Sequence, residues 1–530
     1  MRDLVCAVDV GTGSARAGIF DRQGRMLGRA EHPIAMNRPG AGHAEHDSED
    51  IWRAVCEAVK AVRGIAEAQA GRIAGIGFDA TCSLVVRGRK GEPVCVSSDG
   101  DPRWDTLVWL DHRALGEADE ITANGHRVLD HVGGVMSPEM QTPKLLWLKR
   151  NMPAAWAGAG HFFDLSDFLT WKACGSTTRS QCTLTAKWTY LAHDDGWQDD
   201  FLAAIGLADM RERGSLPQVA TPVGAPLGRL SPDAAQALGL DTQCVVASGL
   251  IDAFSGALGT IGGYDADEIE RHVALIAGTS SCLMGMGAQP RQGRGLWGPY
   301  YGAAIPDLWL WEGGQSATGA LLDHMVQLFG GGRAPDAATH RAVVERISAL
   351  RRLEGESFAA GIHVLPDFHG NRSPVADPRA RGVISGLTLE RSFDNLCRIY
   401  FKTALAIALG LRQIVEHLNA IGVDADTLHV CGGHRHNPLL MELYADASGA
   451  TLCEPISEDA VLLGTGMAAA AAAALHDSLQ AACRQMRREA RQRPRNAARA
   501  AGYERDYRIM LAMQGDRTRI ERIERGQEPA

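Results

Sequence analysis

The chain has 530 residues, which is more than one hydrophobic core usually supports, so we expect at least two domains. Its 45% hydrophobic and 22% charged residues are typical of a soluble globular protein, while the net charge of −9 disfavours a general nucleic-acid binder, because such proteins usually present a basic face. We expect neither a signal peptide nor a membrane span, and the twelve cysteines without a C-x-x-C pair predict reduced thiols in a cytoplasmic protein.

The stretch at residues 7–20, AVDVGTGSARAGIF, predicts a strand, a glycine turn and a second strand. A Rossmann loop is disfavoured because no helical pattern follows the glycines, and the Walker pattern occurs nowhere in the chain. Backbone N–H groups of such a turn, with the hydroxyls of Thr12 and Ser14, can still hold phosphate. Asp9, at the end of the first strand, could hold a hydrated Mg²⁺ nearby. The alternative is a hairpin whose glycines serve only the turn.

The same pattern, G-T-x-S-x-x-x-G, occurs again at residues 278–285, which is 267 residues after its first copy at 11–18. In the second copy Ile276 takes the place of Asp9, so only the first hairpin brings a carboxylate. The repeat predicts two related domains that each offer a hairpin to a shared cleft. This asymmetry suits an ATP site in which one hairpin handles the metal.

Helix and strand patterns alternate along the rest of the chain. Helical spacing covers residues 48–68, and Ser48 is a good N-terminal residue for that helix. Residues 72–86 predict two strands around a polar interruption, and both 245–263 and 427–449 predict a strand, a glycine turn and a helix. Such alternation favours a two-domain α/β protein.

The C-terminal tail begins with seven consecutive alanines, Ala468–Ala474, and continues into Arg-rich sequence that contains Pro494. We predict a helix packed on the second domain, followed by a partly exposed helix. An RNA-binding arm is the alternative, which the interleaved acidic residues and the few aromatic residues disfavour.

Seven motifs, taken together, resemble the FGGY family of carbohydrate kinases, within the actin/hexokinase superfamily. They span about residues 4–467 in the family's order: DVGTGSARAG, WLDHRA, PKLLWLK, GLIDAFSG, AGTSSC, WEGGQSATG and CGGHRHNPLL. Four further stretches are similar to the D-ribulokinase branch: GFDATCSLVV, GGVMSPEMQTPKLLWLK, FFDLSDFLTWKA and PDFHGNRSP.

The resemblance implies an α/β fold with two ribonuclease H-like domains and an active site in the cleft between them. We expect a boundary near residues 256–270. The N-terminal domain, with the sugar site and the first phosphate hairpin, would cover 1–260, the nucleotide-binding C-terminal domain 261–475, and a helical tail 476–530.

By this resemblance Asp252 matches the family's catalytic aspartate, which accepts the proton of the attacking sugar hydroxyl. The alternative is an N-cap of the helix that follows it. Thr81, Cys82, Lys187 and Glu312, with Asp252, would bind the sugar. For Lys187 the alternative is a surface lysine, and for Glu312 a solvated strand end; apolar, Trp-rich flanks disfavour both, because an unpaired buried charge is costly.

Further residues are carried over as nucleotide contacts. The resemblance implies that ATP binds both hairpins and a nucleoside site, with Asp9 placing Mg²⁺, through residues Gly11, Thr12, Gly13, Ser14, Gly278, Thr279, Gly319, Gly433 and Asn437. Two clusters could instead be read as zinc ligands, namely Cys431, His434 and His436, and His363, Asp367 and His369. Neither has the spacing of a closed four-ligand site.

We therefore expect an ATP- and Mg²⁺-dependent kinase for a ketopentose, D-ribulose phosphorylated at its C5 hydroxyl. L-ribulose, D-xylulose and ribitol remain open as acceptors, and an ATP-dependent regulator without a small substrate is the alternative of another class. From cysteine usage, charge and the lack of long apolar runs we also expect a cytoplasmic protein without nucleic-acid or membrane partners, and the resemblance makes a homodimer a reasonable expectation.

Overall fold

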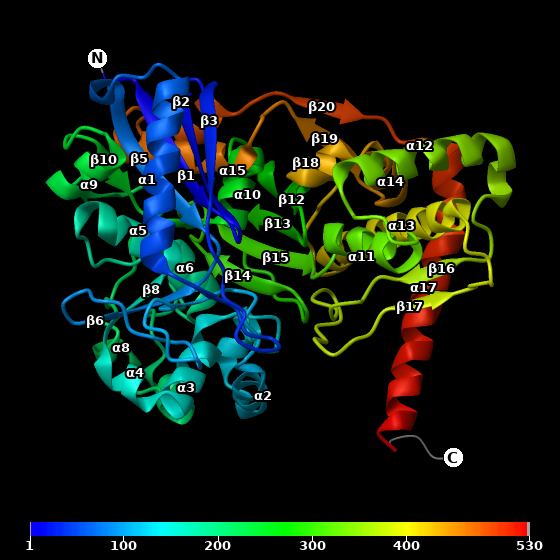
Figure 1. Ribbon diagram of the computed structural model, residues 1–530, viewed down its shortest axis with the longest axis horizontal. Coiled ribbons are helices and arrows are strands. Elements are labelled where there is room, and N and C mark those ends of the chain that lie inside the picture. Colours follow the sequence, from blue (N-terminus) through cyan, green and yellow to red (C-terminus); the bar gives the residue numbers. More distant parts are fainter. Residues whose placement is uncertain (1, 527–530) are drawn as a thin grey trace.

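The computed structural model describes residues 2–526; Met1 and residues 527–530, at the ends of the first predicted domain and of the predicted tail, lie outside the described residues. Figure 1 shows two halves, one built mainly from the N-terminal part of the chain and one mainly from the C-terminal part. Each half is organised around a seven-stranded sheet.

The first sheet has the strand order β3-β2-β1-β5-β10-β9, with β11 beside β5. Its strands are β1 Leu4–Val10, β2 Ser14–Asp21, β3 Met26–Pro33, β5 Ile73–Ala80, β9 Pro226–Arg229, β10 Val245–Ala247 and β11 Leu250–Ile251. β1 runs antiparallel to β2 and parallel to β5. Every residue of β1 is buried, because helices cover both faces of the sheet, which is why this strand reads as a nearly continuous apolar run.

Alternate residues of β1 belong to two different cores. Cys6 and Val8 pack with one set of helices: α1 Ser48–Ile65, α5 Leu165–Cys174 and α9 Pro232–Leu238. Val5 and Ala7 face the opposite core, with α10 Asp252–Ile261, α15 Ala460–Ala472 and α16 Leu479–Met486. The period of two along a strand places Asp9 on this second face, toward α10.

The helix predicted over 48–68 begins at Ser48 as expected and ends at Ile65. Asp47, not Ser48, supplies its cap, since the Asp47 carboxylate accepts the N–H groups of Glu49 and Asp50. The Ser48 hydroxyl instead donates to Asp105 Oδ2 at 2.6 Å. Both residue types make good caps, so only the tertiary contact to Asp105 decides between them.

The second sheet repeats this arrangement in the order β14-β15-β13-β12-β18-β19-β20. Its strands are β12 His272–Ala277, β13 Ser281–Gly287, β14 Trp297–Tyr301, β15 Trp309–Gln315, β18 Thr427–Cys431, β19 Thr451–Pro455 and β20 Ala490–Arg493. β12 is antiparallel to β13 and parallel to β18, as β1 is to β2 and β5. The two copies of the glycine motif are therefore the same hairpin in two related sheets.

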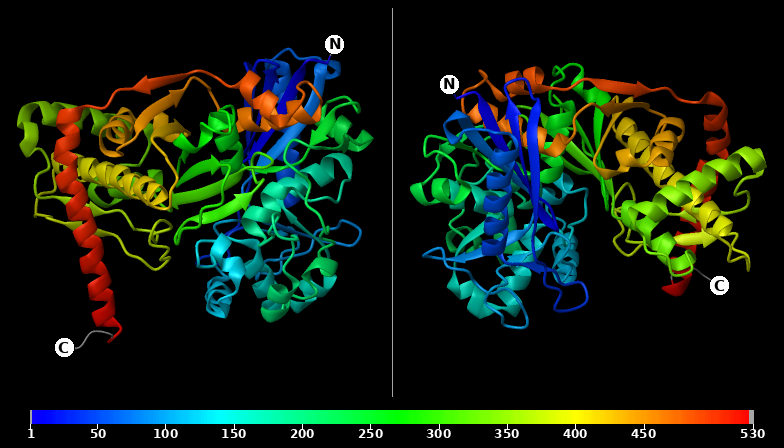
Figure 2. Two further views of the ribbon diagram at one scale, coloured as in Figure 1. Left: turned by 180° about the vertical axis from the view of Figure 1, so that it is seen from behind. Right: turned by 45° about the horizontal axis from the view of Figure 1, so that its top comes forward.

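Helices and a small ribbon complete the second half. They are α11 Gly319–Phe329, α12 Ala337–Glu354, α13 Phe393–Ala420, α14 Pro438–Ala447 and α17 Ala497–Glu524, with the paired strands β16 His363–Leu365 and β17 Val383–Ser385. In both views of Figure 2 this half lies beside the first, and the left view shows α17 extending away from the body of the molecule toward the C-terminus.

A further segment of the first half lies below its main sheet in Figure 1 and faces the second half. It contains a four-stranded sheet, β4-β7-β6-β8, and several short helices. The elements are β4 Glu45–His46, β6 Leu84–Gly88, β7 Thr106–Leu107, β8 Ala159–Asp164, α2 Leu115–Asn124, α3 Gln141–Asn151, α4 Pro153–Gly158, α6 Gln181–Lys187, α7 Asp199–Ala204 and α8 Met210–Arg213. A parallel bridge between Val132 and Gly298 joins this segment to β14 of the second sheet.

The alanine-rich helix α15 packs on the first sheet, so the prediction that it packs on the second domain is wrong. Its backbone lies close to β5: a Cβ at Gly75 would stand 2.7 Å from the Ala469 carbonyl oxygen, and one at Gly77 would stand 2.8 Å from that of Thr465. Alanine is the side chain that allows such an approach along a whole helix. The chain then returns through β20 to the second half, where α17 is partly exposed, as predicted.

The crossing of α10 and α15 is close enough to be tested. A Cβ at Gly259 would stand 2.0 Å from the Ala460 carbonyl oxygen, which belongs to the backbone and cannot swing away. We expect Gly259→Ala to lower the free energy of unfolding by about 1–3 kcal/mol or more, measured by urea denaturation. Gly116→Ala, in α2 with nothing within 4 Å of the new methyl group, should be neutral or slightly stabilising. Equal losses in both variants would contradict this account.

Two predictions made from composition can be compared with the fold. All twelve cysteines are present as free thiols. Among residues 2–526, no helix combines the length and the hydropathy that a bilayer crossing needs.

Candidate active site

The first glycine hairpin, between β1 and β2, has the geometry that its sequence predicted. Gly11 N–H donates to the Ser14 carbonyl at 3.0 Å and closes the turn. The Arg16 guanidinium passes over Gly11, with Nη2 2.6 Å from where a Cβ would be, so any larger residue at this position would have to displace Arg16. A Cβ at Gly13 would meet nothing within 4 Å, so the tip of the turn is open to a ligand.

The two hydroxyls of this hairpin differ in what they can offer. Thr12 Oγ1 accepts a hydrogen bond from Trp109 Nε1 at 3.0 Å, which leaves the hydroxyl proton available for a phosphate oxygen. Ser14 Oγ donates to Glu31 Oε1 at 2.7 Å, so that proton is already committed. Thr12 is therefore the better placed of the two predicted donors.

Acidic side chains gather behind the hairpin. Asp9 of β1 is paired in register with Asp79 of β5 and with Arg16 of β2, whose Nη2 lies 3.1 Å from Asp9 Oδ2. Burial raises the pKa of Asp9 to about 7 against the effect of Arg16, and the neighbouring carboxylates of Asp459 and Asp252 add to the rise. Burial, reinforced by Asp9, also raises the pKa of Asp79.

Asp252 is the first residue of α10, directly after β11, which pairs with β5. Its Oδ1 accepts the N–H of Ala253 at 2.7 Å, so this carboxylate satisfies a free N–H of the first helical turn, although Ile251 occupies the N-cap position. Burial raises the pKa of Asp252, and the Ala253 N–H, Arg16 and Lys187 oppose that rise. The carboxylate thus lies between the acidic hairpin and the predicted sugar residues.

Lys187 and Glu312, which come from different halves of the chain, form a buried ion pair. Lys187 Nζ at the end of α6 lies 3.2 Å from Glu312 Oε2 on β15, and each side chain is only 3% exposed. Burial would lower the pKa of Lys187, but the Glu312 carboxylate raises it above the ordinary value, so the ammonium stays charged. The surface-lysine and solvated-strand alternatives are both wrong.

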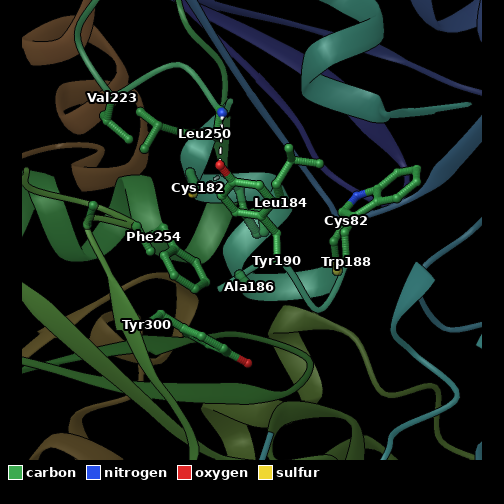
Figure 3. Packing of buried hydrophobic residues seen from close by; sticks show 14 of the residues in the cluster. Cys82, Cys182, Leu184, Ala186, Trp188, Tyr190, Val223, Leu250, Phe254 and Tyr300 are labelled. Atoms are coloured by element: carbon green, nitrogen blue, oxygen red, sulfur yellow. Dashed lines mark hydrogen bonds between the residues drawn. The ribbon is translucent and has the colours of Figure 1, made fainter. Parts of the chain in front are cut away.

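Thr81 and Cys82 follow β5 and are both buried. Thr81 N–H donates to the Val10 carbonyl at 2.9 Å, which ties this turn to the first hairpin. The Cys82 carbonyl accepts Gln141 Nε2 at 3.0 Å. Figure 3 shows Cys82 beside Trp188, next to the helix that ends at Lys187, with Tyr300 facing the same packed region.

On the nucleotide side, the Gly278 carbonyl joins three elements of the second half. It accepts the Gly319 N–H at 3.1 Å, the Thr318 hydroxyl at 3.2 Å and His434 Nε2 at 2.8 Å. A Cβ at Gly319 would stand 2.6 Å from this oxygen, so the start of α11 requires glycine. Thr279, at the tip of the second hairpin, accepts the Thr318 N–H at 3.0 Å through its carbonyl.

The turn after β18 also lies next to the second hairpin, against the carbonyl of Ala277. Gly432 has a φ of +84° and would place a Cβ 2.4 Å from the Ala277 carbonyl, whereas a Cβ at Gly433 would meet nothing within 4 Å. Asn437 caps α14 by accepting the N–H groups of Leu439 and Leu440 at 3.1 and 3.3 Å. Gly433 therefore faces open space, while the Asn437 side chain serves the helix.

His434, Asp367 and His369, which belong to the two rival zinc clusters, have other partners. His434 Nδ1 lies 2.9 Å from the Tyr444 hydroxyl, and burial lowers the pKa of this imidazole to about 4. Asp367 is paired with Arg517, and His369 stacks on His112 with the ring centroids 5.7 Å apart. These contacts hold each side chain in a packing or ion-pair role.

Several residues of the site were missed from the sequence. Arg16 and Asp79 are neighbours of Asp9 in strand register, a signal that becomes readable only once the pairing of β1 is known. Trp297 lies under Lys187, with Nζ 4.2 Å from the ring centroid. Glu139 and Arg372 form an ion pair of 3.1 Å between distant segments, which no local pattern announces.

Comparison with known proteins agrees with this architecture. Residues 4–259 match the N-terminal domain, and residues 273–473 the C-terminal domain, of the FGGY family of carbohydrate kinases. An FGGY carbohydrate kinase domain-containing protein from Homo sapiens is 43% identical over 502 residues, covering 90% of each chain. A D-ribulokinase from Saccharomyces cerevisiae is 35% identical over 511 residues, covering 88% of this chain and 71% of its own.

Solved structures show the same fold. A xylulose kinase from Brucella ovis superposes with a TM-score of 0.81 at 20% identity, covering 98% of this chain and 100% of its own. The predicted α/β fold, with two ribonuclease H-like domains of the actin/hexokinase type, is confirmed.

Proposed function

The chain belongs to the FGGY family of carbohydrate kinases, and we propose that it transfers the γ-phosphate of ATP to the C5 hydroxyl of D-ribulose, giving D-ribulose 5-phosphate. The observation that carries the proposal is the buried pair of Lys187 and Glu312 from the two halves, next to Asp252. A 35% identity to a D-ribulokinase supports this sugar over the alternatives.

The charged pair suits a polyhydroxylated substrate. The Lys187 ammonium has donors beyond the one used by Glu312, and the Glu312 carboxylate has free lone pairs. A ketose supplies hydroxyl and carbonyl groups for both, in surroundings from which water is largely excluded, since each side chain is only 3% exposed. With Thr81 and Cys82 adjoining, the set defines the proposed sugar site.

The Asp252 carboxylate provides the general base. Its Oδ1 is held by the Ala253 N–H, which leaves Oδ2 to accept the proton of the attacking hydroxyl. The open tip at Gly13 and the free proton of Thr12 lie ready for phosphate oxygens. In the second half the Gly278, Gly319 and Gly433 backbones would border the nucleoside.

For the domains we propose the ranges 1–260, 261–475 and 476–530.

A magnesium ion fits the acidic cluster. Asp9 and Asp79 carry buried carboxylate oxygens that accept no hydrogen bond from the described residues, apart from the ion pair with Arg16 and the bond of Asp79 Oδ2 to Thr465. Burial raises the pKa of both carboxyl groups, Asp252 adds to both rises, and Asp9 adds to that of Asp79, so a divalent cation would stabilise the charged forms of this donor set. When bound, the ion would neutralise charge on the transferred phosphoryl group.

Magnesium dependence gives a direct prediction for Asp9. We expect Asp9→Asn to raise the Mg²⁺ concentration for half-maximal turnover by about tenfold or more, because a neutral amide holds the hydrated ion less well. Titration of turnover with Mg²⁺ at fixed ATP measures this, and chelation with EDTA should stop turnover altogether. A variant with the wild-type Mg²⁺ dependence would rule Asp9 out as the metal-placing residue.

The proposed reaction is tested by measuring ADP release with Mg²⁺ and ATP on D-ribulose, L-ribulose, D-xylulose, ribitol, glycerol and no sugar. A preference for D-ribulose by more than about tenfold in kcat/KM supports the proposal, because substrates that differ at one hydroxyl leave a buried partner unpaired. Preference for another acceptor would replace the sugar and keep the kinase. ATP hydrolysis without any phosphosugar would favour the regulator.

A further inference from the structure

A cavity of about 250 Å³ lies next to the proposed sugar site, between the two halves. One side comes from residues 135–139 of the first half, before α3, and the other from residues 368–380 of the second half, between β16 and β17. Its volume is several times the roughly 30 Å³ of a water molecule in the liquid, so it could take one or two further CHOH groups.

Three side chains line the cavity and also reach the sugar site: Glu139, Trp297 and Arg372. The indole of Trp297 contacts Lys187 and Arg372, with the two cations 4.2 and 5.1 Å from its ring centroid. Only a single layer of side chains therefore separates the Lys187–Glu312 pair from the cavity.

Arg372 is the most firmly held member of this layer. Its Nη2 lies 3.2 and 3.1 Å from the two carboxylate oxygens of Glu139, and its Nη1 lies 3.5 Å from Cys282 Sγ. Cys282 Sγ in turn lies 3.7 Å from Glu312 Oε1. A Cβ at Gly314 would stand 3.2 Å from Arg372 Nη1, so the guanidinium lies directly on β15, two residues from Glu312.

These contacts connect the charged groups one to the next, from Asp252 to Glu139. The charges of Lys187 and Glu312 affect the pKa of Asp252. The Lys187–Glu312 pair contacts Arg372 through Trp297 and Cys282. Arg372 in turn forms an ion pair with Glu139. If Asp252 receives the proton of the phosphorylated hydroxyl, the opposite end of the sugar points to Arg372 and Glu139. Guanidinium donors and carboxylate acceptors complement the carbonyl and hydroxyl groups at that end of a ketose.

The loop that carries Arg372 is fixed independently of the sugar site. A buried ion pair between Asp367 and Arg517 of α17 holds its beginning, and Ser373 Oγ donates to the Gly295 carbonyl at 2.7 Å. A second ion pair from the same loop, Arg379 with Asp119 of α2, also crosses between the halves but is about half exposed and does not line the cavity.

We propose that Arg372 and Glu139 bind the end of the ketose remote from the phosphorylated hydroxyl and form the wall that limits its length to five carbons. This rests on the proposed function of the same site. Removal of the wall would join the sugar site to the cavity, so the enzyme would accept ketoses with one more CHOH group.

The test compares kcat/KM for D-ribulose and for the ketohexose D-allulose in the wild type, Arg372→Ala, Arg372→Lys and Arg379→Ala. In Arg372→Ala, the ratio of kcat/KM for the ketohexose to kcat/KM for the ketopentose should rise about tenfold or more. The kcat/KM for D-ribulose should fall mainly because its KM rises. Arg372→Lys should lie between that variant and the wild type. Arg379→Ala, which removes a bridge of the same loop outside the cavity, should leave the ratio unchanged.

The proposal is wrong if the ketohexose-to-ketopentose ratio of kcat/KM is unchanged in Arg372→Ala, or if it shifts equally in Arg379→Ala. If Arg372→Ala does not fold, Glu139→Gln serves in its place, since it keeps the shape of the side chain and removes the charge of the acceptor. This variant should raise KM for D-ribulose about tenfold. An unchanged KM would contradict the proposal that the pair binds the sugar. If the wild type phosphorylates no ketose, the proposed function itself is wrong. If the wild type is active on D-ribulose, the proposed function stands, and the variants then test only whether Arg372 and Glu139 limit the length of the sugar.

Discussion

Replacing Asp252 with asparagine should lower turnover by about 10²–10⁴-fold or more while ATP binding is largely kept. Asparagine has the same shape and can still accept the Ala253 N–H, but it cannot take a proton from the sugar hydroxyl. Phosphosugar formation measures the loss, and calorimetry measures ATP binding. Asp233→Asn is the matched control, because Asp233 also lies in the first turn of a helix, α9, but is exposed away from the site.

Near-normal turnover in Asp252→Asn would sink the assignment of Asp252 as the base. A pH profile of the wild type adds a second check. A base works only when deprotonated, so kcat/KM should fall as the pH drops through the pKa of Asp252. Burial raises that pKa above the ordinary 3.8 of an aspartate, so the decline should begin at a higher pH than for an exposed carboxylate.

The second large effect is expected at the buried ion pair. Lys187→Met should abolish measurable sugar phosphorylation and lower the free energy of unfolding by about 3–5 kcal/mol, because it leaves the Glu312 carboxylate buried without its partner. The double variant Lys187→Met/Glu312→Gln should recover much of that stability, since no isolated charge remains, but no activity. Urea denaturation and phosphosugar assays read the two quantities separately.

An exposed pair provides the control for this prediction. Arg150 and Glu120 are 44% and 56% exposed, and Arg150→Ala should change the free energy of unfolding by less than about 1 kcal/mol. Recovery of sugar phosphorylation in the double variant would show that the pair serves only stability. That result would remove Lys187 and Glu312 from the proposed sugar site.

Local patterns were sufficient for the hairpins and for the strands and helices expected at residues 48–86, 245–263 and 427–449. Alternating residues around Gly11 and Gly13, and their repeat at Gly278, predict antiparallel pairs because side chains alternate and glycine tolerates the turn. That helices cover both faces of the sheet around β1 came only from the structure, where every residue of this strand is buried.

Contacts between distant segments could not be read in the same way. The alanine helix α15 was expected on the wrong half, because alanine marks close packing but not the surface it packs on; Gly75 and Gly77 of β5 supply that surface. Asp47 displaced Ser48 as a cap because Asp105 engages the Ser48 hydroxyl.

Patterns and motifs of the chain were enough to predict the α/β class with two domains, the paired glycine hairpins and the candidates Asp252, Lys187 and Glu312. The tertiary structure was needed to show that Lys187 and Glu312 neutralise each other, and that the ion pair of Glu139 and Arg372 lies beside them. The difference lies in how far apart along the chain the interacting residues are. Strand and helix patterns reflect forces between residues a few positions apart, whereas a buried ion pair depends on where whole elements dock.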